Sequence, residues 1–63
     1  MLTAKIYRHG INKKVQETII TDVSVSDLEK KADAWGAVRI EFAFGEVWRK
    51  IRTEWVVMEN KMG

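Results

Sequence analysis

Residues 37–44 read Ala37-Val38-Arg39-Ile40-Glu41-Phe42-Ala43-Phe44, and this stretch decides the class of fold. Its large apolar side chains stand at every second position, namely Val38, Ile40, Phe42 and Phe44. Because successive side chains of a strand point to opposite faces of the sheet, this spacing gives one apolar face and one polar face. The stretch therefore predicts a half-buried antiparallel sheet. It identifies no activity.

The segment that follows Gly45-Glu46 has two interpretations. Val, Trp, Ile and Thr dominate residues 47–58, a composition that favours a strand, and Gly45-Glu46 suits a two-residue turn. We expect such a turn to pair Phe44 with Val47, Ile40 with Ile51 and Glu41 with Lys50. The alternative is a C-terminal helix at 46–59, because four apolar residues would lie within one helical arc: Val47, Ile51, Trp55 and Met58.

Two further strands are predicted at residues 2–9 and 14–23. A hairpin loop at 10–13 joins them, since Gly10 and Asn12 both tolerate a positive φ. Ile19 and Ile20 are neighbours and would point to opposite faces, so that either one of them is exposed or a bulge re-aims it. The sequence does not set the register of this strand.

A helix is predicted at residues 26–35. Ser26 and Glu29 have the spacing of a capping box, and Gly36 follows where a glycine commonly ends a helix. One apolar stripe recurs at helical spacing: Val25, Leu28, Ala32 and Trp35. Because so short a helix is marginal alone, its stability must come from this stripe, and we expect Trp35 to lie against the sheet near Phe42 or Phe44.

The expected architecture is α+β, with the order β-β-α-β-β. It is a four-stranded antiparallel sheet (strands at about 2–9, 14–23, 37–44 and 47–58) with one helix packed on one face. We expect the whole chain, 1–63, to form a single small domain, with a frayed tail from Glu59 onwards.

The composition argues against catalysis. The 63 residues include one histidine and no cysteine, so that neither a thiolate metal site nor a disulfide is available, and the glycines are isolated. His9 has no carboxylate close in sequence that would orient it as a general base. We therefore expect a non-enzymatic protein without metal or cofactor. No apolar run could cross a bilayer, and the cytoplasm is the expected compartment.

The sheet face opposite the helix is the candidate binding surface. Trp and Tyr interleaved with Lys and Arg are typical of protein interfaces and also of surfaces that stack bases. We expect a host protein, or a second copy of the chain in a homodimer, to bind there. The candidate residues are Lys5, Tyr7, Arg39, Trp48, Lys50 and Arg52.

The alternative partner is a nucleic acid. Residues 1–16 carry four cationic side chains and no acidic one, although the net charge of the whole chain is only +2. The small size and the missing catalytic groups are also typical of accessory proteins of bacteriophages and mobile elements, a comparison of kind that rests on no motif.

Overall fold

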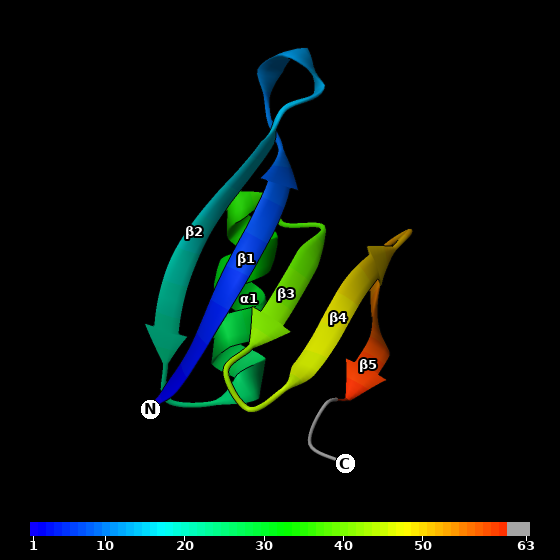
Figure 1. Cartoon of the computed structure of the whole chain (residues 1–63). Coiled ribbons are helices and arrows are strands. Elements are labelled where there is room, and N and C mark those ends of the chain that lie inside the picture. The colour runs from blue at the N-terminus through cyan, green and yellow to red at the C-terminus, as the bar shows by residue number, and fades with distance from the viewer. Residues whose placement is uncertain (61–63) are drawn as a thin grey trace.

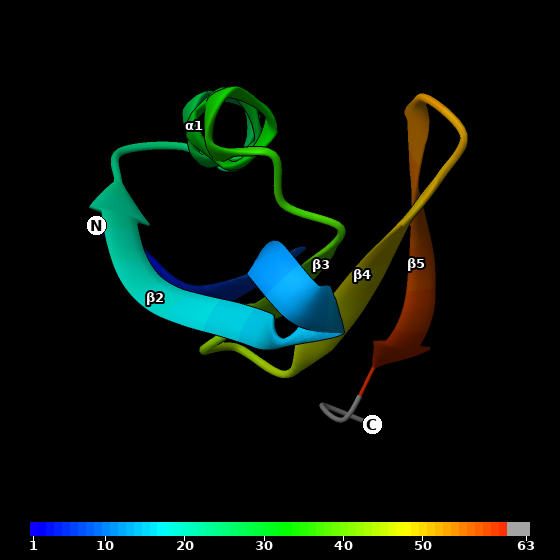
Figure 2. The ribbon, with the colours of Figure 1, turned by 90° about the horizontal axis from the view of Figure 1, so that it is seen from above.

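The computed structural model describes residues 1–60 of the 63-residue chain. One helix, α1 (Val25–Trp35), packs on one face of a five-stranded antiparallel sheet with the strand order β2-β1-β3-β4-β5 (Figures 1 and 2). The α+β class is confirmed, but the sheet has five strands where the sequence predicted four. The strands are β1 (Leu2–His9), β2 (Val15–Asp22), β3 (Arg39–Phe42), β4 (Glu46–Ile51) and β5 (Glu54–Asn60).

Strands β1 and β2 form a hairpin that projects beyond the end of α1 (Figure 1). Its loop contains the short 3-10 turn η1 (Ile11–Lys13), and the Gly10 N–H closes the loop by donating to the Lys14 carbonyl at 2.6 Å. Ala4 pairs with Ile20, which places Ile20 on the helix side. Its neighbour Ile19 points to the other face and is 64% exposed. Of the two alternatives for this isoleucine pair, the structure therefore shows the first: Ile19 is exposed, and no bulge re-aims it.

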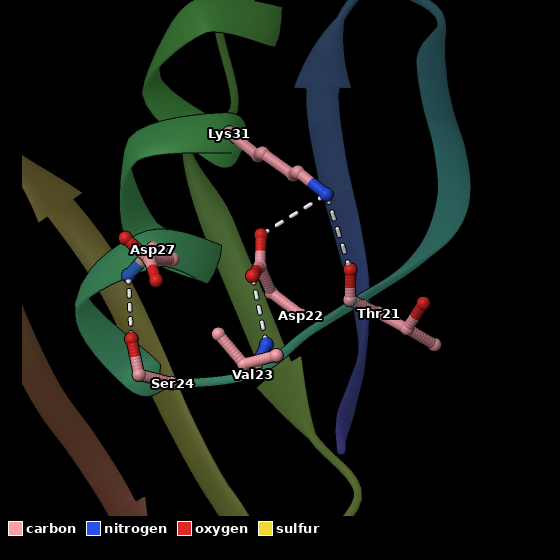
Figure 3. A network of polar contacts seen from close by, with 6 residues as sticks. All are labelled: Thr21, Asp22, Val23, Ser24, Asp27 and Lys31. Atoms are coloured by element: carbon pink, nitrogen blue, oxygen red, sulfur yellow. Dashed lines mark hydrogen bonds and ion pairs between the residues drawn. The ribbon is translucent and has the colours of Figure 1, made fainter.

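The connection between β2 and α1 is held by polar contacts at the start of the helix (Figure 3). The Ser24 hydroxyl accepts a hydrogen bond from the Asp27 N–H at 3.1 Å, so Ser24 is the N-cap. The predicted cap, Ser26, is wrong because that residue already lies inside the first turn of the helix. Lys31 pairs with Asp22 at 3.0 Å and, together with the Val23 N–H, holds the pKa of the Asp22 carboxyl below its usual value.

The core lies between α1 and the sheet. Leu28 and Ala32 of the predicted apolar stripe are fully buried, and Gly36 ends the helix with a φ of 82°. Small residues let the helix approach the strands closely, and large aliphatic side chains fill the remaining space. The buried cluster consists of Ala4, Ile6, Leu28, Ala32, Ala37, Ile40 and Phe42.

Trp35 packs against the edge of this core, but its expected place near Phe42 or Phe44 is wrong. The Arg8 guanidinium stacks on the Trp35 ring with Cζ 4.2 Å from the centroid, and Arg8 Nη1 donates to the Trp35 carbonyl at 3.1 Å. Phe42 pairs with Ala4, four residues or about 13 Å along β1 from Arg8. The direction of α1 therefore carries Trp35 to the opposite end of the sheet from the two phenylalanines.

The β3–β4 hairpin differs from the predicted one in both its turn and its register. The turn has three residues, 43–45, with Gly45 at its end in a positive φ of 108°. Ile40 pairs with Trp48 and Glu41 with Val47, a shift of three residues along β4 from the expected partner of Ile40, which was Ile51. Because the shift is odd, every side chain of β4 changes face.

The segment predicted as one strand at 47–58 is two strands, and the alternative helix at 46–59 is wrong. A two-residue turn separates β4 from β5, with Ile51 paired to Glu54. Arg52 takes a positive φ of 59° there, at a position where hairpins usually place glycine. Glu59 and Asn60, expected in a frayed tail, belong to β5; residues 61–63 of that tail lie outside the described residues.

The N-cap gives a direct test of this helix start. Replacing Ser24 with Ala leaves the Asp27 N–H without its partner and should lower the free energy of unfolding by about 1 kcal/mol. Ser26→Ala is the matched control and should change stability by less than about 0.5 kcal/mol. Urea denaturation followed by circular dichroism measures both. A larger loss for Ser26→Ala than for Ser24→Ala would contradict the assigned cap.

Candidate open-face groove

The sheet face turned away from α1, here called the open face, follows from the strand registers. Ala4, Ile6, Ile40 and Phe42 are buried under the helix, so the alternate residues of the same strands point the other way. The register carries this alternation to the neighbouring strands. The open face presents Lys5, Tyr7 and His9 of β1; Val15, Glu17 and Ile19 of β2; Arg39 and Glu41 of β3; and Val47 and Arg49 of β4.

A hydrogen-bonded trio occupies the middle of the open face. The Tyr7 hydroxyl donates to Glu41 Oε1 at 2.5 Å, and Arg39 Nη2 donates to Glu41 Oε2 at 2.8 Å. The Arg39 Cζ atom also lies 5.6 Å from the centroid of the Tyr7 ring. Both oxygens of Glu41 are therefore engaged, and the trio fixes the orientation of the Tyr7 ring.

This geometry changes two pKa values in opposite directions. The hydrogen bond to Glu41, burial and the negative charge of Glu41 raise the pKa of Tyr7 from 10.0 to about 12. The hydrogen bond from Tyr7, followed by the charge of Arg39, keeps the pKa of Glu41 below its usual value. The Glu41 contribution to stability is present above its ordinary pKa and is lost as the pH falls through the lowered one. The Tyr7 contribution is complete below pH 10.0 and is lost as the pH rises towards 12.

Two arginines stand directly opposite each other beside this trio. Arg39 of β3 pairs with Arg49 of β4, and both side chains lie on the open face. Directly opposed like charges disfavour strand pairing. Glu41 neutralises Arg39, but none of the ion pairs within residues 1–60 includes Arg49.

The open face is hollowed into a groove of about 760 Å³, here called the open-face groove. Polar side chains on its surface come from three neighbouring strands: Tyr7, His9, Arg39 and Arg49. Apolar side chains line the groove as well, together with Lys50 and Glu59, and Val47 is only 8% exposed there. The other apolar residues that line it are Val15, Val38 and Met58. Arginine and tyrosine beside apolar side chains are a composition that is common at protein interfaces.

Trp48 and Lys50, two of the predicted candidates, lie on the helix side because of the shifted register. Trp48 makes an edge-to-face contact with Phe42 at 4.9 Å between centroids, and its Nε1 donates to Glu46 at 2.9 Å. Lys50 borders the groove, but its ammonium group bonds to Asp33 of α1 and lies over the Trp55 ring. The expected place of Trp48 and Lys50 on the uncovered face is therefore wrong.

The remaining candidates divide between the groove and its surroundings. Lys5, Tyr7 and Arg39 lie on the open face as predicted, whereas Arg52 lies in the β4–β5 turn. Sequence reasoning missed Arg49 as a member of this face. Gly45 is the signal that could have placed Arg49 on this face. If Gly45 is taken as the last residue of a three-residue turn, which is a known hairpin type, the observed register of β4 follows.

No protein-family model matches the chain, nor does any curated protein or solved structure. Within residues 1–60, no group of three or more His, Asp or Glu side chains is arranged to hold a metal ion. The same residues include no helix with the length and apolarity that spanning a bilayer requires.

The single tyrosine makes the trio accessible to spectroscopy. Titration of the tyrosinate absorbance should give a midpoint near 12, and Glu41→Gln should move it towards 10.0, because the carboxylate that favours the protonated phenol is gone. Glu17→Gln is the control. It removes only a minor charge effect on Tyr7 and should shift the midpoint far less. An unchanged midpoint in a folded Glu41→Gln protein would disprove the assigned contact.

Proposed function

We propose that this protein is a non-enzymatic interaction module that binds a protein partner through the open-face groove. One observation carries the proposal: a groove lined by both apolar and charged side chains, with two opposed arginines, lies on the face that α1 leaves uncovered. Tyrosine and arginine are enriched among the residues that dominate protein–protein binding energy. The fixed Tyr7 ring offers a partner such a contact without a further loss of side-chain freedom.

The available side chains also favour binding over catalysis. His9 makes no side-chain hydrogen bond within residues 1–60 that would orient its ring, and both Glu41 oxygens already accept hydrogen bonds. The hydrogen bond from Tyr7 and the charge of Arg39 also lower the pKa of Glu41, which makes its carboxylate a weaker base. The trio is better suited to holding a surface in shape than to transferring protons.

We propose a second interaction surface, for self-association of two copies of the chain, at the outer edge of β5. Within residues 1–60, strand β5 pairs with β4 alone, so its outer backbone N–H and C=O groups have no strand partner among these residues. Val56, Val57 and Met58 are consecutive and are 39%, 51% and 52% exposed. Residues 54–59 include neither lysine nor proline, the residues that commonly block edge pairing. We propose that two copies join their β5 edges across a two-fold axis.

The second candidate is a nucleic-acid-binding protein, which the opposed arginines and the basic β1–β2 hairpin favour. Lys13 and Lys14 lie at the exposed tip of that hairpin, where they could neutralise phosphates. Single-stranded nucleic acids also need aromatic rings to stack on. Trp48 packs under the helix side of the sheet instead, which weakens this alternative relative to a protein partner.

Two exposed valines test the groove as a protein-binding site. Val15 lines the groove, whereas Val23 is similarly exposed in the β2–α1 connection outside it. A partner captured from host lysate and identified by mass spectrometry should bind the purified parent and Val23→Asp equally. It should bind Val15→Asp at least about tenfold more weakly, as a lost interface contact of about 1.4 kcal/mol requires. Equal binding by Val15→Asp would overturn the groove as the site.

Sedimentation equilibrium tests the edge pairing. At micromolar concentration the parent should behave as a dimer of the 7.3 kDa chain. Val57→Lys should be monomeric, because a lysine on the edge strand blocks pairing. Val23→Lys, which changes an exposed valine outside β5, in the connection that follows β2, should remain dimeric. A parent protein that sediments only as a monomer would overturn the proposed dimer.

A further inference from the structure

One of the two opposed arginines that line the groove, Arg49, has no carboxylate partner among residues 1–60. Arg39 donates to Glu41, and the remaining oxygen of Glu41 accepts from Tyr7. Both Glu41 oxygens are thus directed at Tyr7 and Arg39, and Arg49 takes part in no ion pair within residues 1–60. A guanidinium group presents five N–H donors in a planar fork that matches a carboxylate or a phosphate.

The surroundings of Arg49 strengthen its attraction for an anion. Val47, two residues earlier on the same face of β4, is almost fully buried, and Met58 of β5 lines the groove beside it. The Arg49 side chain is itself exposed, so that a partner can reach its guanidinium group beside these apolar side chains. The nearby Arg39 adds a second positive charge from the opposite strand. An anion seated here would relieve the repulsion between the two arginines.

The charge around the groove distinguishes between two classes of anion. Glu17 pairs with Tyr7 across β1 and β2, Glu41 lies beside Arg39, and Glu59 lines the groove. A continuous polyanion such as a nucleic acid would pass close to all three carboxylates. A protein segment can place one acidic side chain on the arginines and apolar side chains on the valine and methionine wall. The arrangement therefore complements an acidic, partly apolar peptide better than a phosphodiester chain.

We propose that Arg49, together with Arg39, binds an aspartate or glutamate side chain of an acidic segment in the partner protein. This inference rests on the proposed function, because it names the chemistry of the partner at the same groove. The acidic side chain receives the free N–H donors of Arg49, and the apolar neighbours of that side chain in the partner contact Val47 and Met58.

The test uses two labelled eight-residue peptides, one alternating Val and Glu and the other alternating Val and Gln. Fluorescence anisotropy at about 50 mM salt should show saturable binding of the Glu peptide, weakening as salt is raised, and at least about tenfold weaker binding of the Gln peptide. Arg49→Gln should weaken binding of the Glu peptide about ten- to hundredfold, the loss expected for hydrogen bonds to a charged group. Arg52→Gln, which changes an arginine outside the groove, should bind like the parent.

Folding of the variants is followed by thermal melting. Arg49→Gln should melt at or above the temperature of the parent, because it removes a like-charge cross-strand pair, so a loss of binding cannot be attributed to unfolding. Unchanged binding by Arg49→Gln, equal binding of both peptides, or no binding of the Glu peptide would overturn the inference. So would a single-stranded oligonucleotide that binds through Arg49 more tightly than the Glu peptide, since it would assign the arginines to phosphate.

The inference and the proposed function can fail separately. A captured protein partner that is lost with Val15→Asp but retained with Arg49→Gln would leave the groove as a protein-binding site and remove its acidic specificity. A partner unaffected by Val15→Asp, together with Arg49-dependent binding of the Glu peptide, would retain the anion site and overturn the groove as the docking surface of that partner.

Discussion

The pairing of Ile40 with Trp48 across β3 and β4 is the constraint on which both faces of the sheet depend. Ile40 is completely buried beneath α1, and its cross-strand partner must point to the same side. Trp48 therefore closes the core against Phe42, and the residues on either side of it, Val47 and Arg49, point to the open face. A single register thus decides the composition of the core and of the open face together.

The β4–β5 hairpin is tied back to the helix through Asp33. Its carboxylate accepts from the Lys50 ammonium group and from the Trp55 indole N–H, the latter at 3.0 Å. Lys50 also lies 4.8 Å from the centroid of the Trp55 ring. These contacts join the two C-terminal strands to α1, which otherwise packs mainly against β1, β2 and β3. The tryptophans of this hairpin consequently serve the fold, and the open face is left with Tyr7 as its aromatic residue.

The open face combines a hydrogen-bonded trio, whose side chains are held in place, with a pair of opposed arginines that disfavours folding. The Tyr7–Glu41–Arg39 trio satisfies its own donors and acceptors and holds its side chains in place. Arg49, opposite Arg39, adds repulsion that no carboxylate within residues 1–60 offsets by an ion pair. Side chains that weaken the fold without an evident structural gain are common at binding surfaces, where selection acts on recognition. This contrast is the physical basis for assigning the groove to a ligand.

Local patterns in the sequence determined those helices and strands that can be recognised from residues close together in the chain. The alternation at residues 37–44 predicted a strand with one apolar face, of which residues 39–42 form β3, and the spacing of Leu28 and Ala32 specified the buried stripe of the helix. Gly36 marked the helix end correctly, because only a residue without a side chain adopts its positive φ at low cost. On the open face, Lys5, Tyr7 and Arg39 were placed correctly, because their faces follow from alternation within strands that were located correctly.

Tertiary structure alone decided how these elements meet. Gly45 is compatible with a two-residue or a three-residue turn, and the choice between them moves the register by an odd number of residues and reverses every side chain of β4. Arg52 gives no turn signal, yet it adopts a positive φ because pairing of β4 with β5 stabilises the hairpin around it. Burial of Trp48 against Phe42 favours the observed register, and that contact joins residues whose pairing no local pattern specifies. The strands and the helix were thus properties of the sequence, whereas the face on which each arginine and tryptophan stands was a property of the packed molecule.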